Sequence, residues 1–199
     1  LSFDDGDIGV SHDGTGLVLT GQSTDSIEVV GSVGVTVLGE AGDDTLTGGD
    51  GNDTIDGGEG DDILTGGLGS DDLEGGSGSD TVYGGDGSDF IDGDDGSDTL
   101  FGEGGSDDID GGLGNDTLDG GLGSDVLDGG SGNDDLSGGD GSDTLTGGSG
   151  SDVIDGGYDH DVAVFAGDQG DYTFASSADG LTVTVTQRYT GDADTVTDV

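Results

Sequence analysis

A nine-residue unit repeats fourteen times between residues 39 and 164 without an insertion or a deletion. Residues 48–56 read GGDGNDTID and residues 147–155 read GGSGSDVID, and the consensus is G-G-x-G-x-D-x-U-x, with U a large aliphatic residue. The eighth position holds Leu, Ile or Val in thirteen copies and Ala163 in the last. A strict period of this kind predicts a solenoid, in which each unit packs against its neighbours in the stack.

The chemistry of the consensus suggests how one unit folds. Glycine at positions one, two and four permits positive φ, so six residues can turn sharply and present carbonyl oxygens to one point. The last three positions suffice for a short strand whose central aliphatic side chain faces inward. A turn and a strand go half way round, so two units are expected to close one coil, with odd copies in one sheet and even copies in the other.

This consensus resembles that of the repeats-in-toxin (RTX) family, the haemolysin-type calcium-binding repeat proteins, over roughly two thirds of the chain. The resemblance implies an all-β fold, a right-handed parallel β-roll whose two sheets lie back to back. The tail, with D-V-A-V-F-A-G-D, D-Y-T-F and D-T-V-T-D-V, is also similar to the segment that follows the repeats in that family.

Composition explains why such a roll needs cations. One basic residue faces 47 acidic residues, the formal net charge is -46, and only 27% of residues are hydrophobic. Composition alone is typical of disorder, and the stacked aliphatic residues are too few to outweigh the entropy of ordering the repeats. Carboxylates stacked about 5 Å apart would also repel one another. We therefore expect positive charge between the coils.

The sixth position of every copy supplies the candidate ligand. We predict metal-binding roles for Asp44, Asp53, Asp62, Asp71, Asp80, Asp89, Asp98, Asp107, Asp116, Asp125, Asp134, Asp143, Asp152 and Asp161. Aspartate and carbonyl oxygens from two loops make a flexible cage, which favours Ca²⁺ over Mg²⁺. Pairs one coil apart, such as Asp44 with Asp62, would share an ion, so the two edges offer up to about twelve inter-loop sites.

Other classes of function find little support. The acidic excess argues against nucleic acid and anionic membrane surfaces, and no apolar run is long enough for membrane insertion. The sequence contains no Cys, no H-E-x-x-H, no G-x-S-x-G and no P-loop, and His12 and His160 are too isolated for a transition-metal site. We predict a module that is not an enzyme.

Three regions are expected. Residues 1–38 form an irregular β-rich flank, with strands near 17–20, 27–30 and 33–38, the last in phase with the repeats. Residues 39–164 form the roll. Residues 165–199 form a β-hairpin cap, with strands near 172–175, 181–187 and 195–199 and a turn at 178–180. Because the chain begins with Leu and ends before an export signal would appear, we expect a segment of a larger polypeptide.

The resemblance implies type I secretion of an unfolded chain that folds on extracellular calcium. The β-rich residues 1–38 favour a structural role in an adhesin, surface-layer or filament protein, with self-association or a cell-surface partner. The alternative is a secretion and folding module of an exported enzyme or toxin, such as a protease, a lipase or a haemolysin. Two surface features stay open at this level, an acidic column from Asp56 to Asp128 and the neighbouring Tyr83 and Phe101, for which we predict a solvated face and packing between coils.

Overall fold

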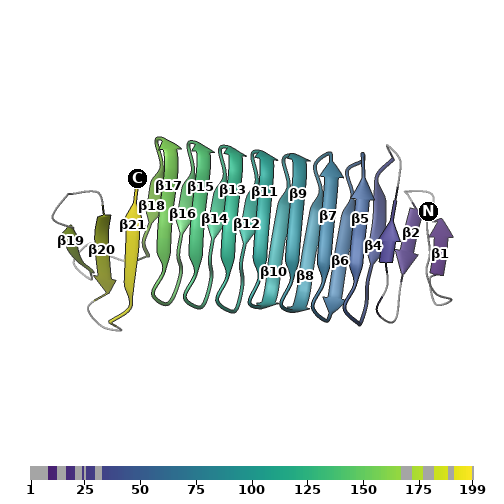
Figure 1. The fold of residues 1–199 in the computed structure, drawn as a ribbon, viewed down its shortest axis with the longest axis horizontal. Helices are drawn as coiled ribbons and strands as arrows, with labels where there is room; N and C mark the ends of the chain where they lie inside the picture. The colour runs from purple at the N-terminus through teal and green to yellow at the C-terminus, as the bar shows by residue number, and fades with distance from the viewer. Residues whose placement is uncertain are drawn as a thin grey trace.

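The computed structural model of the chain describes residues 9–12, 17–20, 24, 26–29, 33–166, 172–176, 182–187 and 191–198. Within these residues, strands form two sheets that stack into an elongated solenoid (Figure 1). The described part of the chain contains no helix, and therefore no helix that could span a membrane.

Along most of the chain, successive strands belong alternately to one sheet and to the other. In spatial order, the first sheet contains β3 (Ser26–Glu28), β5 (Thr45–Gly49), β7 (Ile63–Leu68), β9 (Thr81–Gly87), β11 (Thr99–Gly105), β13 (Thr117–Gly123), β15 (Asp135–Gly141), β17 (Val153–Asp159), β21 (Ala193–Thr197), β20 (Thr182–Gln187) and β19 (Tyr172–Ser176). The second contains β1 (Gly9–His12), β2 (Leu17–Thr20), β4 (Val35–Leu38), β6 (Thr54–Glu59), β8 (Asp72–Gly78), β10 (Phe90–Gly96), β12 (Asp108–Asp110), β14 (Val126–Asp128), β16 (Thr144–Thr146) and β18 (Val162–Val164).

The register confirms that two repeats make one coil. Neighbouring repeat strands are parallel, and residues eighteen positions apart lie side by side, such as Leu64 with Val82 and Leu100 with Leu118. The thirteen large aliphatic residues from Leu46 to Ile154 are each at most 1% exposed, and Ala163 packs against them half-buried. The eighth position of the repeat is therefore the core of the roll.

Several strands run further than the three residues that the sequence suggests. Strand β9 continues into the glycine turn of the next repeat, and Gly85 and Asp86 pair there with Glu103 and Gly104 of the following coil. The reason is that backbone N–H and C=O groups in a glycine turn also form hydrogen bonds with the turn one coil away, so the strand pairing continues into the turn.

The stack extends beyond the repeats at its N-terminal end. Strand β4 pairs with β6, aligning Val37 with Ile55, as the phase of residues 36–38 predicts. Strand β2 pairs with β4, and β3 pairs with β5 in the other sheet. The sheets therefore begin before the aspartate pattern does.

At the other end the chain forms the predicted hairpin, and the strand expected near 195–199 is present as β21, at Ala193–Thr197. Strand β19 pairs antiparallel with β20, which pairs antiparallel with β21, and β21 lies parallel to β17. The predicted turn at 178–180 lies outside the described residues. Figure 1 shows these three strands beyond the last repeat, at the C-terminal end of the stack.

Non-glycine residues hold left-handed backbone at four glycine positions of the repeat. At position two, φ is 67° at Glu40, 62° at Asp94 and 67° at Glu103, and at position four it is 83° at Asp159. A regular position-two glycine such as Gly85 has φ 112°. The turn therefore keeps its shape without glycine, at the cost of strain in the substituted residue.

Candidate metal centre

The sixth-position aspartates form two ladders, one along each edge of the roll. Thirteen of them are at most 3% exposed, and Asp161 in the last copy is half-buried. Burial of this many carboxylates is unusual, because an ionised carboxylate strongly prefers water. Each one therefore needs partners that replace its hydration.

In the thirteen ladder aspartates from Asp53 to Asp161, Oδ1 accepts a backbone N–H from the preceding coil. The backbone N–H of Asp44 donates to Oδ1 of Asp62 at 2.7 Å, and that of Asp80 donates to Oδ1 of Asp98 at 2.8 Å. The same bond joins all twelve pairs of ladder aspartates that lie eighteen residues apart. The ladders predicted from the sequence are thus present, joined by backbone-to-carboxylate bonds.

The other oxygen has no hydrogen-bond partner. Among the residues that the structure describes, Oδ2 is buried and has no hydrogen-bond partner in all fourteen sixth-position aspartates. Burial raises the pKa of Asp98 and Asp107 to about 7, against the lowering effect of their backbone hydrogen bonds, and ladder neighbours such as Asp80 and Asp89 raise it further. Burial likewise raises the pKa of Asp80 to about 6. The protein alone leaves half of each carboxylate poorly stabilised.

Oδ2 of a ladder aspartate and a backbone carbonyl oxygen of the next coil lie near the same point, beside the first glycine of the repeat. The position that a Cβ on Gly84 would take lies 2.6 Å from Oδ2 of Asp89 and 3.0 Å from the carbonyl oxygen of Gly102, in the next coil. One repeat later, the corresponding position at Gly93 lies 2.8 Å from each of the equivalent two oxygens. Two hydrogen-bond acceptors thus converge on one point, which suits a cation.

The donor set fits a hard cation such as Ca²⁺. A carboxylate oxygen and a carbonyl oxygen converge in turns such as that of Gly84, and Ca²⁺ takes six to eight oxygens in flexible geometry. Within the described residues no three His, Cys, Asp or Glu side chains cluster as a metal site. The arrangement accounts for this, because each turn contributes a single sixth-position carboxylate and the backbone supplies the other oxygens.

The sequence reading missed one residue that continues a ladder. Asp194 Oδ1 accepts the backbone N–H of Asp152 at 3.1 Å, although the two residues are 42 positions apart. A signal was present, because D-T-V-T at 194–197 repeats positions six to nine of the consensus. The period of the array does not predict a ladder position for Asp194, because this segment lies out of phase with the repeats.

The outer face of the second sheet carries the expected acidic column. Asp56, Glu74, Asp92, Asp110 and Asp128 align one above the other across five strands. Burial raises the pKa of the carboxyl groups in Asp56, Glu74 and Asp110. These groups stand on the outside of the roll, so they oppose pairing of this face with another acidic chain.

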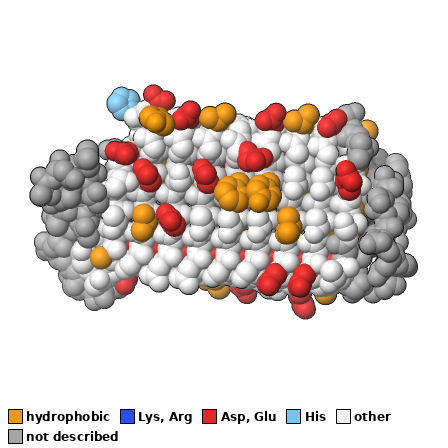
Figure 2. All heavy atoms as spheres, in the orientation of Figure 1, with side chains coloured by type: hydrophobic (Ala, Val, Ile, Leu, Met, Phe, Trp, Pro, Cys, Tyr) orange, Lys and Arg blue, Asp and Glu red, His pale blue; other side chains and the backbone are white. Residues whose placement is uncertain are grey.

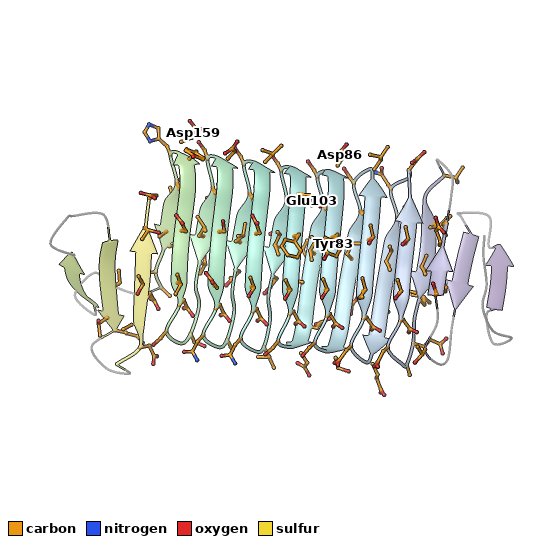
Figure 3. The ribbon with its side chains drawn as sticks, in the orientation of Figure 1. Tyr83, Asp86, Glu103 and Asp159 are labelled. Atoms are coloured by element: carbon orange, nitrogen blue, oxygen red, sulfur yellow. The ribbon has the colours of Figure 1, made fainter. Side chains whose placement is uncertain are left out.

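The other open feature is resolved as packing between coils. The rings of Tyr83 and Phe101 are stacked, with centroids 5.1 Å apart and planes 8° from parallel. Figure 3 shows Tyr83 in the middle of the sheet face, and in the same view Figure 2 shows hydrophobic side chains gathered there among acidic ones. The pair stabilises two adjacent rungs from the outside.

Comparison with known proteins agrees with this geometry. The family model of the RTX calcium-binding nonapeptide repeat, which describes four copies, matches residues 38–73, 65–100, 74–109, 101–136, 128–163 and 137–172. No curated protein matches the chain. The matches cover most of the solenoid, and repeats of this family bind calcium. The chain belongs to the family of RTX calcium-binding nonapeptide repeat proteins.

Proposed function

We propose that this roll is a calcium-dependent folding module of a larger secreted or cell-surface protein, in which its role is structural. The observation that carries the proposal is the buried, unpartnered Oδ2 atom of all fourteen sixth-position aspartates. A chain with 47 acidic residues and one basic residue has almost no side chains of its own to neutralise them. Folding therefore depends on cations from solution.

Each ladder aspartate in the middle of the roll can link three successive coils. Oδ1 of Asp89 accepts the N–H of Asp71 in the preceding coil. Oδ2 of Asp89 and the carbonyl oxygen of Gly102 in the following coil both lie within 3.0 Å of the position of a Cβ on Gly84. Bound calcium would supply positive charge and would coordinate these oxygens. Since ladder aspartates pair in twelve gaps, such as Asp44 with Asp62, the roll offers up to about twelve sites.

Dependence on calcium fits export by type I secretion. Cytosolic calcium is too low to neutralise the ladders, so the chain would leave the cell unfolded, and extracellular calcium would fold it. This assigns the module to the extracellular space or to the bacterial cell surface.

A structural parent protein, such as an adhesin, a surface-layer protein or a filament protein, is favoured by the N-terminal end of the stack. Strands β1, β2 and β3 continue both sheets beyond the first repeat, so the solenoid passes into further β-structure. In the alternative, an exported enzyme or toxin would use the same roll to aid its own secretion and folding.

A calcium titration tests the proposal. Far-ultraviolet circular dichroism should change from a disordered to a β-sheet spectrum between about 0.1 µM and about 10 mM calcium. Magnesium over the same range is the control and should not produce the transition. An unchanged β-sheet spectrum in excess chelator would show that folding does not need calcium. Light scattering on the same samples separates the parent classes, because self-association on folding supports the structural one.

A further inference from the structure

An open groove of about 500 Å³ crosses the outer face of the first sheet, from the region of β3 to β11. Thr47 and Thr65 line it on the face of the sheet, and the third-position residues Asp50, Leu68 and Asp86 line it at the edge turns. The residues that line the groove include none of the ladder aspartates. The groove is therefore separate from the turns in which calcium is expected.

The floor of the groove is a row of glycines that ends at Glu103. Gly49, Gly67 and Gly85 hold the second position of the repeat in successive coils and lie side by side in the sheet. Glu103 takes the same position in the next coil, beside Gly85, and also lines the groove. Because glycine has no side chain, the row leaves a channel between the threonines and the edge, and Glu103 stands at its end.

Glu103 holds this place against the preference of its backbone. Its φ of 67° is left-handed, a region that a residue with a side chain rarely adopts. The side chain is exposed, so no burial offsets the strain. Strained residues of this kind concentrate at functional sites, which makes a carboxylate at the end of the groove a candidate for binding.

The charges along the groove suit a ligand with several separate positive groups. Glu28, Asp50, Asp86 and Glu103 line it, and all four are exposed. At ~4.8 Å between strands, the five strands from β3 to β11 span roughly 19 Å. No three acidic side chains cluster as a metal site in the described part of the chain. The carboxylates are therefore spread along the groove and not gathered around one point.

An aromatic ring borders the groove beside these carboxylates. Tyr83 lies next to Thr65 in the following strand, two residues before Gly85, and its ring is stacked on Phe101. Figure 3 shows Tyr83 on this face, with Glu103 and then Asp86 above it in the view. A guanidinium group matches both neighbours, because it pairs with carboxylates and also stacks on aromatic rings.

We propose that this groove binds an extended, arginine-containing segment of a partner protein. About six residues in extended conformation span roughly 19 Å, and alternate side chains point the same way. A second copy of this chain, with 47 acidic residues and one basic residue, would bring carboxylates against carboxylates. The inference goes beyond the proposed function, since it names a surface and the chemistry of its partner, and it needs only the folded roll.

Binding of a labelled peptide to the parent chain at saturating calcium tests the proposal. The probe is a fluorescent hexapeptide with arginine at alternate positions and serine between them, and the control peptide has uncharged citrulline in place of arginine. Fluorescence anisotropy should show saturable binding of one arginine peptide per chain and no binding of the citrulline peptide. Equal binding of the two peptides would contradict the proposal.

Variants locate the site on the roll. Asp86→Asn combined with Glu103→Gln should weaken binding by about tenfold. The matched control combines Glu59→Gln and Asp95→Asn, which remove two exposed third-position carboxylates from β6 and β10 in the second sheet. This control should keep the affinity of the parent chain. Equal losses in the two double variants would mean that the peptide is attracted to the whole acidic surface, and would overturn the groove.

The ring is tested by Tyr83→Leu, which keeps an apolar side chain and should weaken binding by about threefold. If a variant failed to fold, amide chemical shifts of the parent chain would decide the question. On addition of the arginine peptide, the signals of Thr65 and Gly85 should move, while those of Gly76 and Asp92 in the second sheet stay. Shifts spread evenly over both sheets would overturn the site.

Circular dichroism of the same samples distinguishes this inference from the proposed function. If the chain folds with calcium but does not bind the arginine peptide, only the groove is wrong. If the chain stays disordered at saturating calcium, the proposed function is wrong, and the groove with it, since the groove exists only in the folded roll.

Discussion

Single residues in the turns show how strictly the repeat constrains its backbone. Glu103 replaces the second glycine of its copy and holds φ 67°, a conformation that costs a residue with a side chain about 1 kcal/mol or more. Strand β11 continues past Glu103 to Gly105, and Figure 3 shows Glu103 above Tyr83 in the view. Since its side chain is exposed, the substitution brings strain without any burial in return.

We therefore expect Glu103→Gly to stabilise the calcium-loaded roll, by about 0.5–1 kcal/mol after the greater entropy of glycine in the unfolded chain is counted. Urea denaturation at saturating calcium measures the effect. Glu59→Gly is the matched control, because it removes the same exposed charge where φ is not positive. That variant should be destabilised by about 0.5–1 kcal/mol. Equal shifts in the two variants would contradict strain at Glu103.

At the scale of the elements, the turn is the unit that links the coils. Oδ1 of Asp98 accepts the N–H of Asp80 from the coil before it. Oδ2 of Asp98 and the carbonyl oxygen of Gly111, from the coil after it, each lie 2.8 Å from the position of a Cβ on Gly93. A single carboxylate thus contributes to two gaps. Stacking of the strands supplies the core, but the turns decide whether adjacent coils can approach one another.

This arrangement predicts that Asp98→Asn damages two adjacent sites. The amide keeps an oxygen for the N–H of Asp80, so the effect on calcium is separated from the loss of a hydrogen bond. We expect about two ions fewer per chain and a higher calcium midpoint in a circular dichroism titration. Asp95→Asn, an exposed change in the same turn, should leave both unchanged. Unchanged stoichiometry in Asp98→Asn would contradict the ladder.

The whole molecule is a polyanion, and folding brings many of its carboxylates close together. With a net charge of -46, the roll gathers buried carboxylates into two ladders, and the pKa of several of them is raised to about 6 or about 7. The folded chain without cations therefore binds more protons than the unfolded chain, in which the pKa of Asp is near 3.8. Its stability should fall as pH rises from about 4 to about 7.

Acid should consequently substitute in part for calcium. In calcium-free buffer, lowering the pH from about 7.5 to about 5 should increase the β-sheet signal in circular dichroism, because protonation removes the repulsion within the ladders. In the presence of calcium the effect reverses, since protons compete for the same oxygens and the calcium midpoint should rise on acidification. A calcium-free spectrum that is constant over this range would refute the effect of buried charge.

Much of the fold could be predicted from the period alone. The phase of Leu100 and Leu118 determines that they share a column, and the spacing of Asp80 and Asp98 determines that they share an edge, because both follow from a coil of constant length. Calcium binding could also be predicted from the sequence, since buried carboxylates without basic partners require cations. The hydrogen bond from the backbone N–H of each ladder aspartate to the carboxylate one coil later could not be predicted, because it depends on the side-chain orientation within the turn.

The sequence by itself determined the repeating roll, its core and its two aspartate ladders, since these depend on contacts one period away. Only the tertiary structure decided what ends the roll. Asp194 reaches Asp152 across 42 residues, and no period predicts which of several D-x-U-x segments will pair with the last strand. The physical reason is that a terminal rung is selected by the open edge of β17, because the backbone groups, Ile154 and Oδ2 of Asp152 at this edge can bind any segment of the chain that reaches them.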